Sequence, residues 1–216
     1  MGKTESSRAT VFALFLVLLI DSMGFWFIFP VLTPLLMDAN SVGSILPKAD
    51  TLQARNFIYG TVVAIYPLCM FFGAPILGGL SDRFGRKRVL LFALFGTAVG
   101  YLLSAIAVFS HQLWMLYFGR IVDGLTAGSI PIAQAAISDV ASNEKQKARY
   151  LGFVVFALAG GQVFGPLISG VFADQQMSMY FSNKLPFIVA GLLAIVNIVW
   201  LYFTFKETHK VKDQYQ

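Results

Sequence analysis

The sequence predicts an all-α membrane protein whose six transmembrane helices form a three-plus-three inverted repeat. The first observation is composition: 57% of residues are hydrophobic and 12% are charged, against about 25% charged in an average soluble domain. The second is a series of six apolar segments, each near the roughly 20 residues that span a bilayer. The third is a G-x4-G-x3-D pattern that occurs twice, at residues 73–82 and 165–174.

The six apolar segments are expected to be consecutive membrane spans. The first follows two basic residues, as a signal peptide would, but its apolar stretch is too long and no small-residue cleavage site follows. We therefore expect it to remain in the mature protein. The predicted spans are residues 9–36, 57–80, 89–109, 113–137, 151–173 and 185–205.

The distribution of Lys and Arg predicts the orientation. With the N-terminus inside, twelve of the sixteen basic residues lie in cytoplasmic segments and Arg120 lies within a span. Basic residues favour the cytoplasmic side, so both termini are expected there. We expect residues 1–216 to form one bundle, with an outer loop at about 38–56 and a cytoplasmic tail at about 206–216. The outer loops hold three basic residues, Lys48, Arg55 and Lys184.

Signals for a cofactor, metal or nucleotide are missing from the sequence. The one cysteine, Cys69, allows no intramolecular disulfide, and the two histidines, His111 and His209, lie far apart. No G-x-x-x-x-G-K-[ST] phosphate loop occurs. The net charge of +5 is explained by retention of basic loops in the cytoplasm rather than by nucleic-acid binding. We expect neither an enzyme nor a cofactor or metal site.

Asp21 lies midway through the first span. A charge at the bilayer centre costs about 2.5–3.5 kcal/mol on insertion scales, so this carboxylate is expected to face a wet cavity, pair with a cation or carry a proton. Two interpretations follow. Asp21 binds protons or substrate, or it is a structural carboxylate bonded to a neighbouring helix.

The fourth span carries a second group of intramembrane charges. Asp123 follows Arg120 at i+3, nearly on the same helical face. The pair is interpreted either as a local structural ion pair or as a device in which Arg120 tunes the acidity of a carboxylate, Asp123 included. Gln134, fourteen residues after Arg120, is predicted to line the same cavity.

The loop between the second and third spans carries the strongest local motif, GGLSDRFGRKR at residues 78–88. Asp82 ends a helix, Gly85 permits a tight reversal, and four basic residues hold the loop in the cytoplasm. Asp139, at the cytoplasmic end of the fourth span, is expected to pair with Arg83 or Arg86. Such a cluster would latch one conformational state, whereas the plainer interpretation is retention of positive charge inside. Its predicted members are Gly78, Asp82, Arg83, Gly85, Arg86 and Asp139.

The fifth span contains glycines and a proline that predict a bent, closely packed helix. They serve tight packing, and on a functional interpretation they also seal the cavity against leakage. These residues are Gly161, Gly165, Pro166 and Gly170.

Together the motifs resemble those of the major facilitator superfamily. Residues 78–87 are similar to its signature between helices two and three, and residues 120–124 resemble its helix-four motif. Residues 161–170 resemble the helix-five motif associated with antiporters. Residues 21–30 and 207–210 resemble the drug–proton antiporter branch, including the tetracycline efflux proteins.

This resemblance implies a role for Asp21 in proton or substrate binding and for Arg120 in proton transfer. It implies gating by the Asp82 loop and antiport-related packing by Gly165 and Pro166. Asp123 departs from the family pattern, because the corresponding residue is usually neutral and polar. The loop at 38–56 is also long for the group.

A complete family member has twelve helices with its substrate cavity between two six-helix halves, and this sequence resembles the N-terminal half. We therefore expect a proton-coupled antiporter in the bacterial inner membrane that exports a small organic molecule or drug. The second half would come from another six-helix chain or from a homodimer. The alternatives are a symporter that takes up a metabolite, and a truncated half or assembly subunit that transports nothing.

Overall fold

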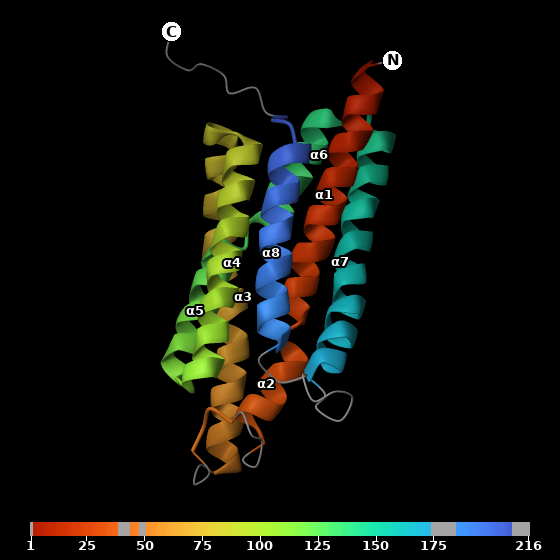
Figure 1. Cartoon of the computed structure of the whole chain (residues 1–216). Coiled ribbons are helices and arrows are strands. Elements are labelled where there is room, and N and C mark those ends of the chain that lie inside the picture. Colours follow the sequence, from red (N-terminus) through yellow and green to blue (C-terminus); the bar gives the residue numbers. More distant parts are fainter. Residues whose placement is uncertain (1, 39–43, 48–50, 174–184, 209–216) are drawn as a thin grey trace.

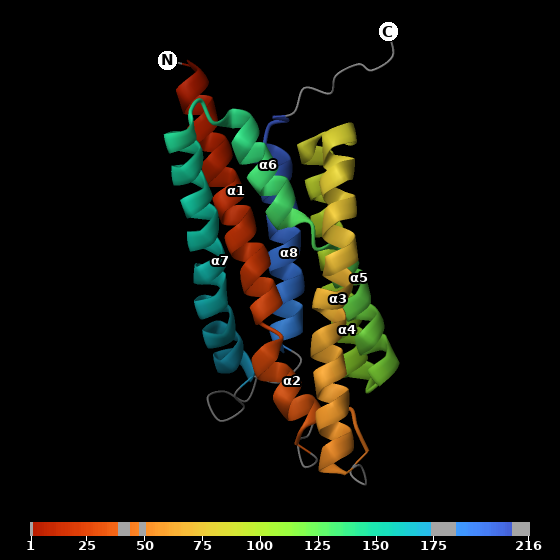
Figure 2. The ribbon, with the colours of Figure 1, turned by 180° about the vertical axis from the view of Figure 1, so that it is seen from behind.

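The computed structural model describes residues 2–38, 44–47, 51–173 and 185–208, which form an all-helical bundle. Successive spans run in opposite directions, and the start of α1 lies at the same end of the bundle as the end of α8 (Figures 1 and 2). The helices are α1 Gly2–Trp26, α2 Phe29–Leu36, α3 Leu52–Phe84, α4 Arg86–Ser110, α5 Leu113–Thr126, α6 Ser129–Val140, α7 Glu144–Ala173 and α8 Leu185–Thr204.

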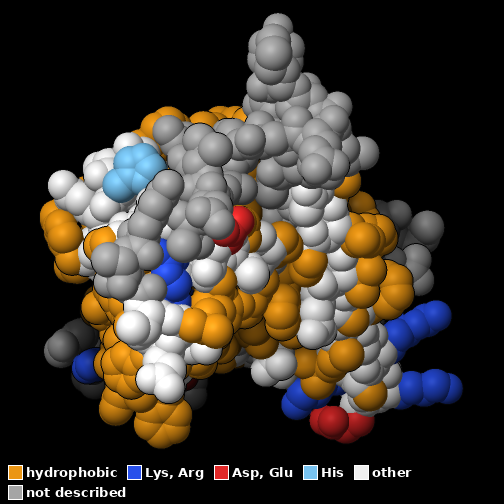
Figure 3. Space-filling model, turned by 90° about the horizontal axis from the view of Figure 1, so that it is seen from below, with side chains coloured by type: hydrophobic (Ala, Val, Ile, Leu, Met, Phe, Trp, Pro, Cys, Tyr) orange, Lys and Arg blue, Asp and Glu red, His pale blue; other side chains and the backbone are white. Residues whose placement is uncertain are grey.

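Five stretches of the described chain are long and apolar enough to cross a membrane. They are Thr10–Leu36, Leu52–Phe84, Arg86–Ser110, Glu144–Phe172 and Leu185–Thr204. Seen end-on, hydrophobic side chains make up much of the described surface (Figure 3). Among the most exposed are Phe71, Phe72, Phe156 and Phe203. A surface of this kind suits contact with lipid rather than with water.

The prediction of one continuous helix at 113–137 is wrong, because α5 ends at Thr126 and α6 begins at Ser129. The reason lies in the sequence Gly128-Ser-Ile-Pro131. A proline ring clashes with the carbonyl four residues earlier, but is tolerated in the first turn of a helix. The first span is interrupted in the same way between α1 and α2, and Pro30 again stands in the first turn after the break.

Packing between the helices has the symmetry that an inverted repeat requires. The first span packs through α1 against α7 and α8, the fifth and sixth spans. The fourth span packs through α5 against α3 and α4, the second and third spans. Exchanging the two triplets of spans exchanges these contacts, as in three-plus-three transporter folds. Asp174, which ends the second copy of the sequence pattern, lies outside the described residues.

Two apolar clusters fill the interior, one toward each end of the bundle. Along the first span, the buried apolar residues between Val11 and Leu18 belong to one cluster and those between Phe27 and Leu36 belong to the other. Along the fourth span, Leu116 belongs to the second cluster and Ile132 to the first. The intramembrane charges of both spans fall between these positions, at one level near the middle of the bundle.

Arg55 is a structural residue rather than an outer-loop cation. Helix α3 begins at Leu52, inside the segment predicted as outer loop, and the Arg55 residue is 2% exposed. Its Nη1 donates to the Leu36 carbonyl at 3.0 Å, and its Nη2 donates to the Pro47 carbonyl at 2.6 Å. The guanidinium thus ties the end of α2 to the chain that follows it. The other two predicted outer cations, Lys48 and Lys184, lie outside the described residues.

Candidate functional site

Asp21 joins the first and fourth spans. Ser129, the first residue of α6, donates its Oγ–H to Asp21 Oδ2 at 2.5 Å. Ser129 is buried, and the N-terminus of a helix favours a negative charge nearby. The break between α5 and α6 therefore creates the partner of this carboxylate. This hydrogen bond joins Asp21 to a neighbouring helix, as the interpretation of Asp21 as a structural carboxylate requires.

Arg120 and Asp123 form the local pair expected from their spacing. Arg120 Nη1 lies 3.3 Å from Asp123 Oδ2, and both side chains are buried. The Arg120 guanidinium also lies 4.7 Å from the centre of the Tyr66 ring and 5.6 Å from that of Phe25. Arg120 Nε is buried without a hydrogen-bond partner among the described residues. The cation is thus held by one carboxylate and two aromatic faces, and its Nε has no acceptor among the described residues.

Asp21 and the Arg120–Asp123 pair are parts of one cluster. Phe25, four residues after Asp21 on α1, lies 5.6 Å from the Arg120 guanidinium, so the charges of the two spans lie at one level. Close approach of α4 helps to enclose them, because a Cβ at Gly100 would lie 2.7 Å from the Asp123 Cβ. At Gly24, a Cβ would lie 2.8 Å from the Tyr101 hydroxyl. Residues of the first four spans therefore meet at this level.

Aromatic side chains line one side of the cluster. The ring centres of Phe25 and Tyr66 are 4.5 Å apart, and those of Trp26 and Phe29 are 5.0 Å apart. Phe27, beside them in sequence, is instead buried in the second apolar cluster. The aromatic group therefore comes from both the first and the second span.

Gln134 lies on α6, beyond the break in the fourth span. The prediction placed it on the face of Arg120 through an unbroken helical phase, which the break after Thr126 interrupts. Its side chain is exposed on α6. The structure brings together Asp21, Arg120 and Asp123, whereas the place of Gln134 on the cavity wall stays a prediction.

Two members of the cluster were missed from the sequence, Ser129 and Tyr66. A signal for Ser129 exists, because a glycine followed by serine and, two residues later, proline is typical of a helix start. Tyr66 lies within an apolar run, where no charge marks it. Its contact with Arg120 depends on how α3 packs against α5.

The 78–88 loop is organised around Arg86. Arg86 Nη1 lies 2.6 Å from Asp82 Oδ1, and Nε lies 3.1 Å from Asp139 Oδ2. Arg86 is buried, whereas Arg83 is exposed, so the partner expected for Asp139 is Arg86. Gly85 makes the reversal with φ = 97°, a backbone conformation favourable only to glycine. The cluster joins the second, third and fourth spans at one end of the bundle.

Glu207, just after α8, adds the sixth span to the loop. Its carboxylate accepts the backbone N–H groups of Arg86 at 2.9 Å and Lys87 at 3.0 Å. Helix α4 begins without a capping side chain of its own, because Gly85 precedes it. A carboxylate from elsewhere satisfies those donors and complements the positive end of the helix. The sequence related Glu207 to the family pattern without indicating this contact. Of the remaining 207–210 motif, His209 and Lys210 lie outside the described residues.

The glycines of α7 differ in what they contact. A Cβ at Gly161 would lie 2.5 Å from the Ser22 Cβ, and one at Gly165 would lie 2.8 Å from the Trp26 Cβ. Gly170 faces open space, and Pro166 stands inside the helix. Gly161 and Gly165 therefore allow α7 to pack closely on α1, whereas Gly170 has no such contact with the described residues.

Comparison with curated proteins finds tetracycline resistance proteins among the relatives. The chain is 35% identical to the tetracycline resistance protein, class H, of Pasteurella multocida over 93% of this chain and 45% of that protein. It is 38% identical to the class B protein of Escherichia coli over 82% of this chain and 44% of that protein. The chain therefore spans about half the length of these relatives.

Solved structures share the fold at lower identity. The human organic anion transporter MFSD10 matches with a TM-score of 0.75 and 20% identity, over 95% of this chain and 49% of that one. The proton:xylose symporter XylE matches with a TM-score of 0.74 and 19% identity, over 94% of this chain and 46% of that one.

The apolar helices identify an integral membrane protein, and its inverted-repeat bundle is shared with half of each solved transporter. The family model of the Major Facilitator Superfamily matches residues 14–215. The chain belongs to the major facilitator superfamily.

Proposed function

We propose that residues 1–216 are the N-terminal six-helix half of a proton-coupled antiporter that exports a small organic molecule. The observation that carries the proposal is the buried cluster of Asp21, Ser129, Arg120 and Asp123 between two apolar clusters. Intramembrane ionisable residues are expensive and mark proton or substrate pathways. Several relatives are named tetracycline resistance proteins, which supports a drug as the cargo.

In the proposed mechanism, Asp21 is the proton carrier and Ser129 positions its carboxylate. Binding a proton neutralises Asp21 and changes the field at Asp123, because both carboxylates belong to the same buried cluster. The change in field then alters the ion pair between Asp123 and Arg120. Moving one charge across a 100 mV potential is worth about 2.3 kcal/mol, which supplies the drive for export.

The 78–88 loop serves as the gate. Arg86 bridges Asp82 and Asp139 across three spans, and Glu207 adds a fourth. Such a network holds one arrangement of the helix ends and breaks when they separate. Asp82 is the exposed member of the network, so neutralising it shifts the balance between states without preventing membrane insertion.

The orientation follows from the charges. The loop at 78–88 and the start of α7 lie at the same end of the bundle as the start of α1 and the end of α8 (Figure 1). This end carries the motif's four basic residues as well as Lys145, Lys147 and Arg149. The positive-inside rule assigns it to the cytoplasm, and the bacterial relatives point to the inner membrane.

The other half of the cavity comes from a second six-helix bundle, either further along this polypeptide or in another one. The chain corresponds to about half of each tetracycline resistance relative, and transporter cavities lie between two repeats. That bundle is a continuation of this polypeptide, a separate chain or another copy of this one. A tagged protein purified gently from its native membrane is expected to contain it, and a lone six-helix monomer would contradict this part of the proposal.

The functional test uses that purified complex in proteoliposomes with a pH-sensitive dye inside. Tetracycline is added outside and proton movement is followed. Asp21→Asn is expected to abolish tetracycline-driven proton flux while expression is retained. The matched control is Asp38→Asn, which removes an exposed carboxylate just after the same span and should leave the flux intact. Unchanged flux in Asp21→Asn would refute proton coupling at this residue.

A further inference from the structure

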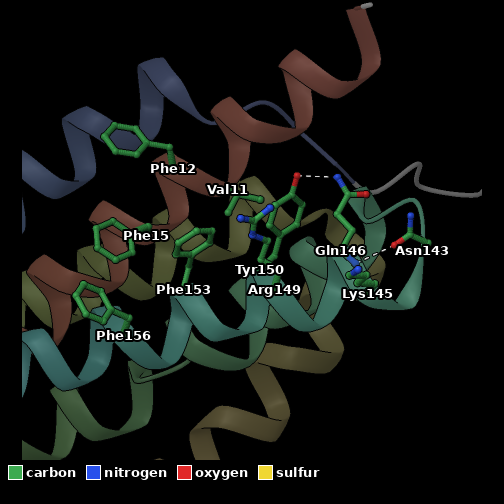
Figure 4. Close-up of a pocket in the computed structure, with 10 residues that line it drawn as sticks. All are labelled: Val11, Phe12, Phe15, Asn143, Lys145, Gln146, Arg149, Tyr150, Phe153 and Phe156. Carbon is green, nitrogen blue, oxygen red and sulfur yellow. Dashed lines mark hydrogen bonds between the residues drawn. The ribbon is translucent and has the colours of Figure 1, made fainter.

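A large groove runs between α1 and α7, away from the buried charged cluster and from the 78–88 loop. Its volume is about 1110 Å³. Figure 4 shows that its lining is graded, with aromatic side chains gathered at one end and polar side chains at the other. The lining residues are Val11, Phe12, Phe15, Asn143, Lys145, Gln146, Arg149, Tyr150, Phe153 and Phe156.

The aromatic end of the groove is formed by side chains of two helices. Phe15 of α1 stacks on Phe156 of α7 with ring centres 6.2 Å apart. Phe12 and Phe153 continue this surface toward the polar end. The exposed fractions of Phe12 and Phe156 are 58% and 69%, so the described protein leaves these rings open to an apolar occupant.

The polar end of the groove is cationic. Lys145 and Arg149 stand four residues apart on α7 and so share one helical face. The ten lining residues include no Asp or Glu. The Gln146 side chain donates to the Tyr150 hydroxyl at 2.7 Å. Both of these polar side chains line the groove together with the two cations. The charge of this end is complementary to an anion.

The spacing between the two ends matches one leaflet of a bilayer. Lys145 and Phe156 are eleven residues apart on a helix, which is a rise of about 16 Å. Half of a hydrocarbon core is about 15 Å thick. A phospholipid carries its charge and its apolar chains in this order and over this length. A peptide lying in the groove would have to satisfy its backbone groups within an aromatic wall.

We propose that this groove binds an anionic phospholipid. Its phosphate lies between Lys145 and Arg149, and one acyl chain lies along the aromatic surface toward Phe156. Basic pockets between transmembrane helices on the cytoplasmic side are suited to anionic headgroups. The site is separate from the proposed transport function and does not rest on it.

The binding test uses the purified chain in mild detergent. It is mixed with equal amounts of phosphatidylglycerol and phosphatidylcholine, and retained lipid is counted by native mass spectrometry. The wild type is expected to prefer phosphatidylglycerol. Lys145→Gln/Arg149→Gln should lower that preference by on the order of 20-fold, from about fivefold per cation near a membrane surface. The control is Lys147→Gln/Lys206→Gln, which removes the same charge outside the groove lining and should keep the preference.

A second measurement locates the lipid without any substitution. Photoactivatable phosphatidylglycerol in vesicles of phosphatidylglycerol and phosphatidylcholine is crosslinked to the wild-type chain, and the labelled peptides are sequenced. Labels are expected on α1 near Phe12 and on α7 near Phe153. Equal loss of preference in both double variants, or labels elsewhere, would overturn the proposal. Crosslinks from this groove to a second helix bundle would also overturn it, because the groove would then be a protein interface.

Discussion

Replacing Gly85 by alanine adds one methyl group at the point where α3 turns into α4. Two consequences follow from the structure. Gly85 has φ = 97° and ψ = 148°, which an alanine adopts only with strain. Its new Cβ would also lie 2.6 Å from Glu207 Oε2, too close for that carboxylate to stay where it is. The substitution therefore strains the loop and displaces the cap of α4 together.

The size of the effect can be worked from these two terms. A residue held in this backbone region costs about 1–3 kcal/mol. Moving Glu207 breaks its hydrogen bonds to the N–H groups of Arg86 and Lys87. Glu207 is exposed and water replaces part of each bond, so about 0.5 kcal/mol is assigned to each. The expected loss of unfolding free energy is about 2–4 kcal/mol.

The measurement is unfolding of the purified chain in mixed micelles with rising SDS, followed by circular dichroism. The matched control is Gly79→Ala, on the same helix end, where an added Cβ meets nothing within 4 Å. Because alanine is the better helix former, this control should be neutral or slightly stabilising. If Gly85→Ala unfolds at the same SDS fraction as Gly79→Ala, the loop does not depend on its positive φ or on the Glu207 cap.

Two further predictions concern the bundle interior. Gly161→Ala should push α7 away from Ser22 and lower the unfolding free energy by about 1–3 kcal/mol. The control Gly170→Ala places its methyl group in open space and should leave the unfolding free energy unchanged. Equal effects of the two substitutions would contradict the packing role of Gly161. Asp123→Asn should cost about 3–5 kcal/mol by leaving Arg120 without its carboxylate. Adding Arg120→Gln should recover part of that loss in a double-mutant cycle, and strict additivity would show that the two side chains do not interact.

Composition and local chemistry were enough to predict much of this protein. Six apolar stretches and the scarcity of charge predicted a membrane bundle, because lipid admits few structures other than apolar helices. The i+3 spacing predicted the contact between Arg120 and Asp123, which needs only one turn of helix. The reversal at Gly85 was predicted likewise, since a glycine between two helices is a local signal.

Contacts between distant segments were decided by the tertiary structure. Ser129 meets Asp21 and Glu207 caps α4 across more than a hundred residues, and Arg55 is buried in α3 although the sequence predicted a loop there. Each contact depends on how helices dock and on where the fourth span breaks. Periodicity tells which face of a helix is apolar, but a polar side chain acquires its partner only when another helix reaches its level. Packing, rather than local sequence, sets that level.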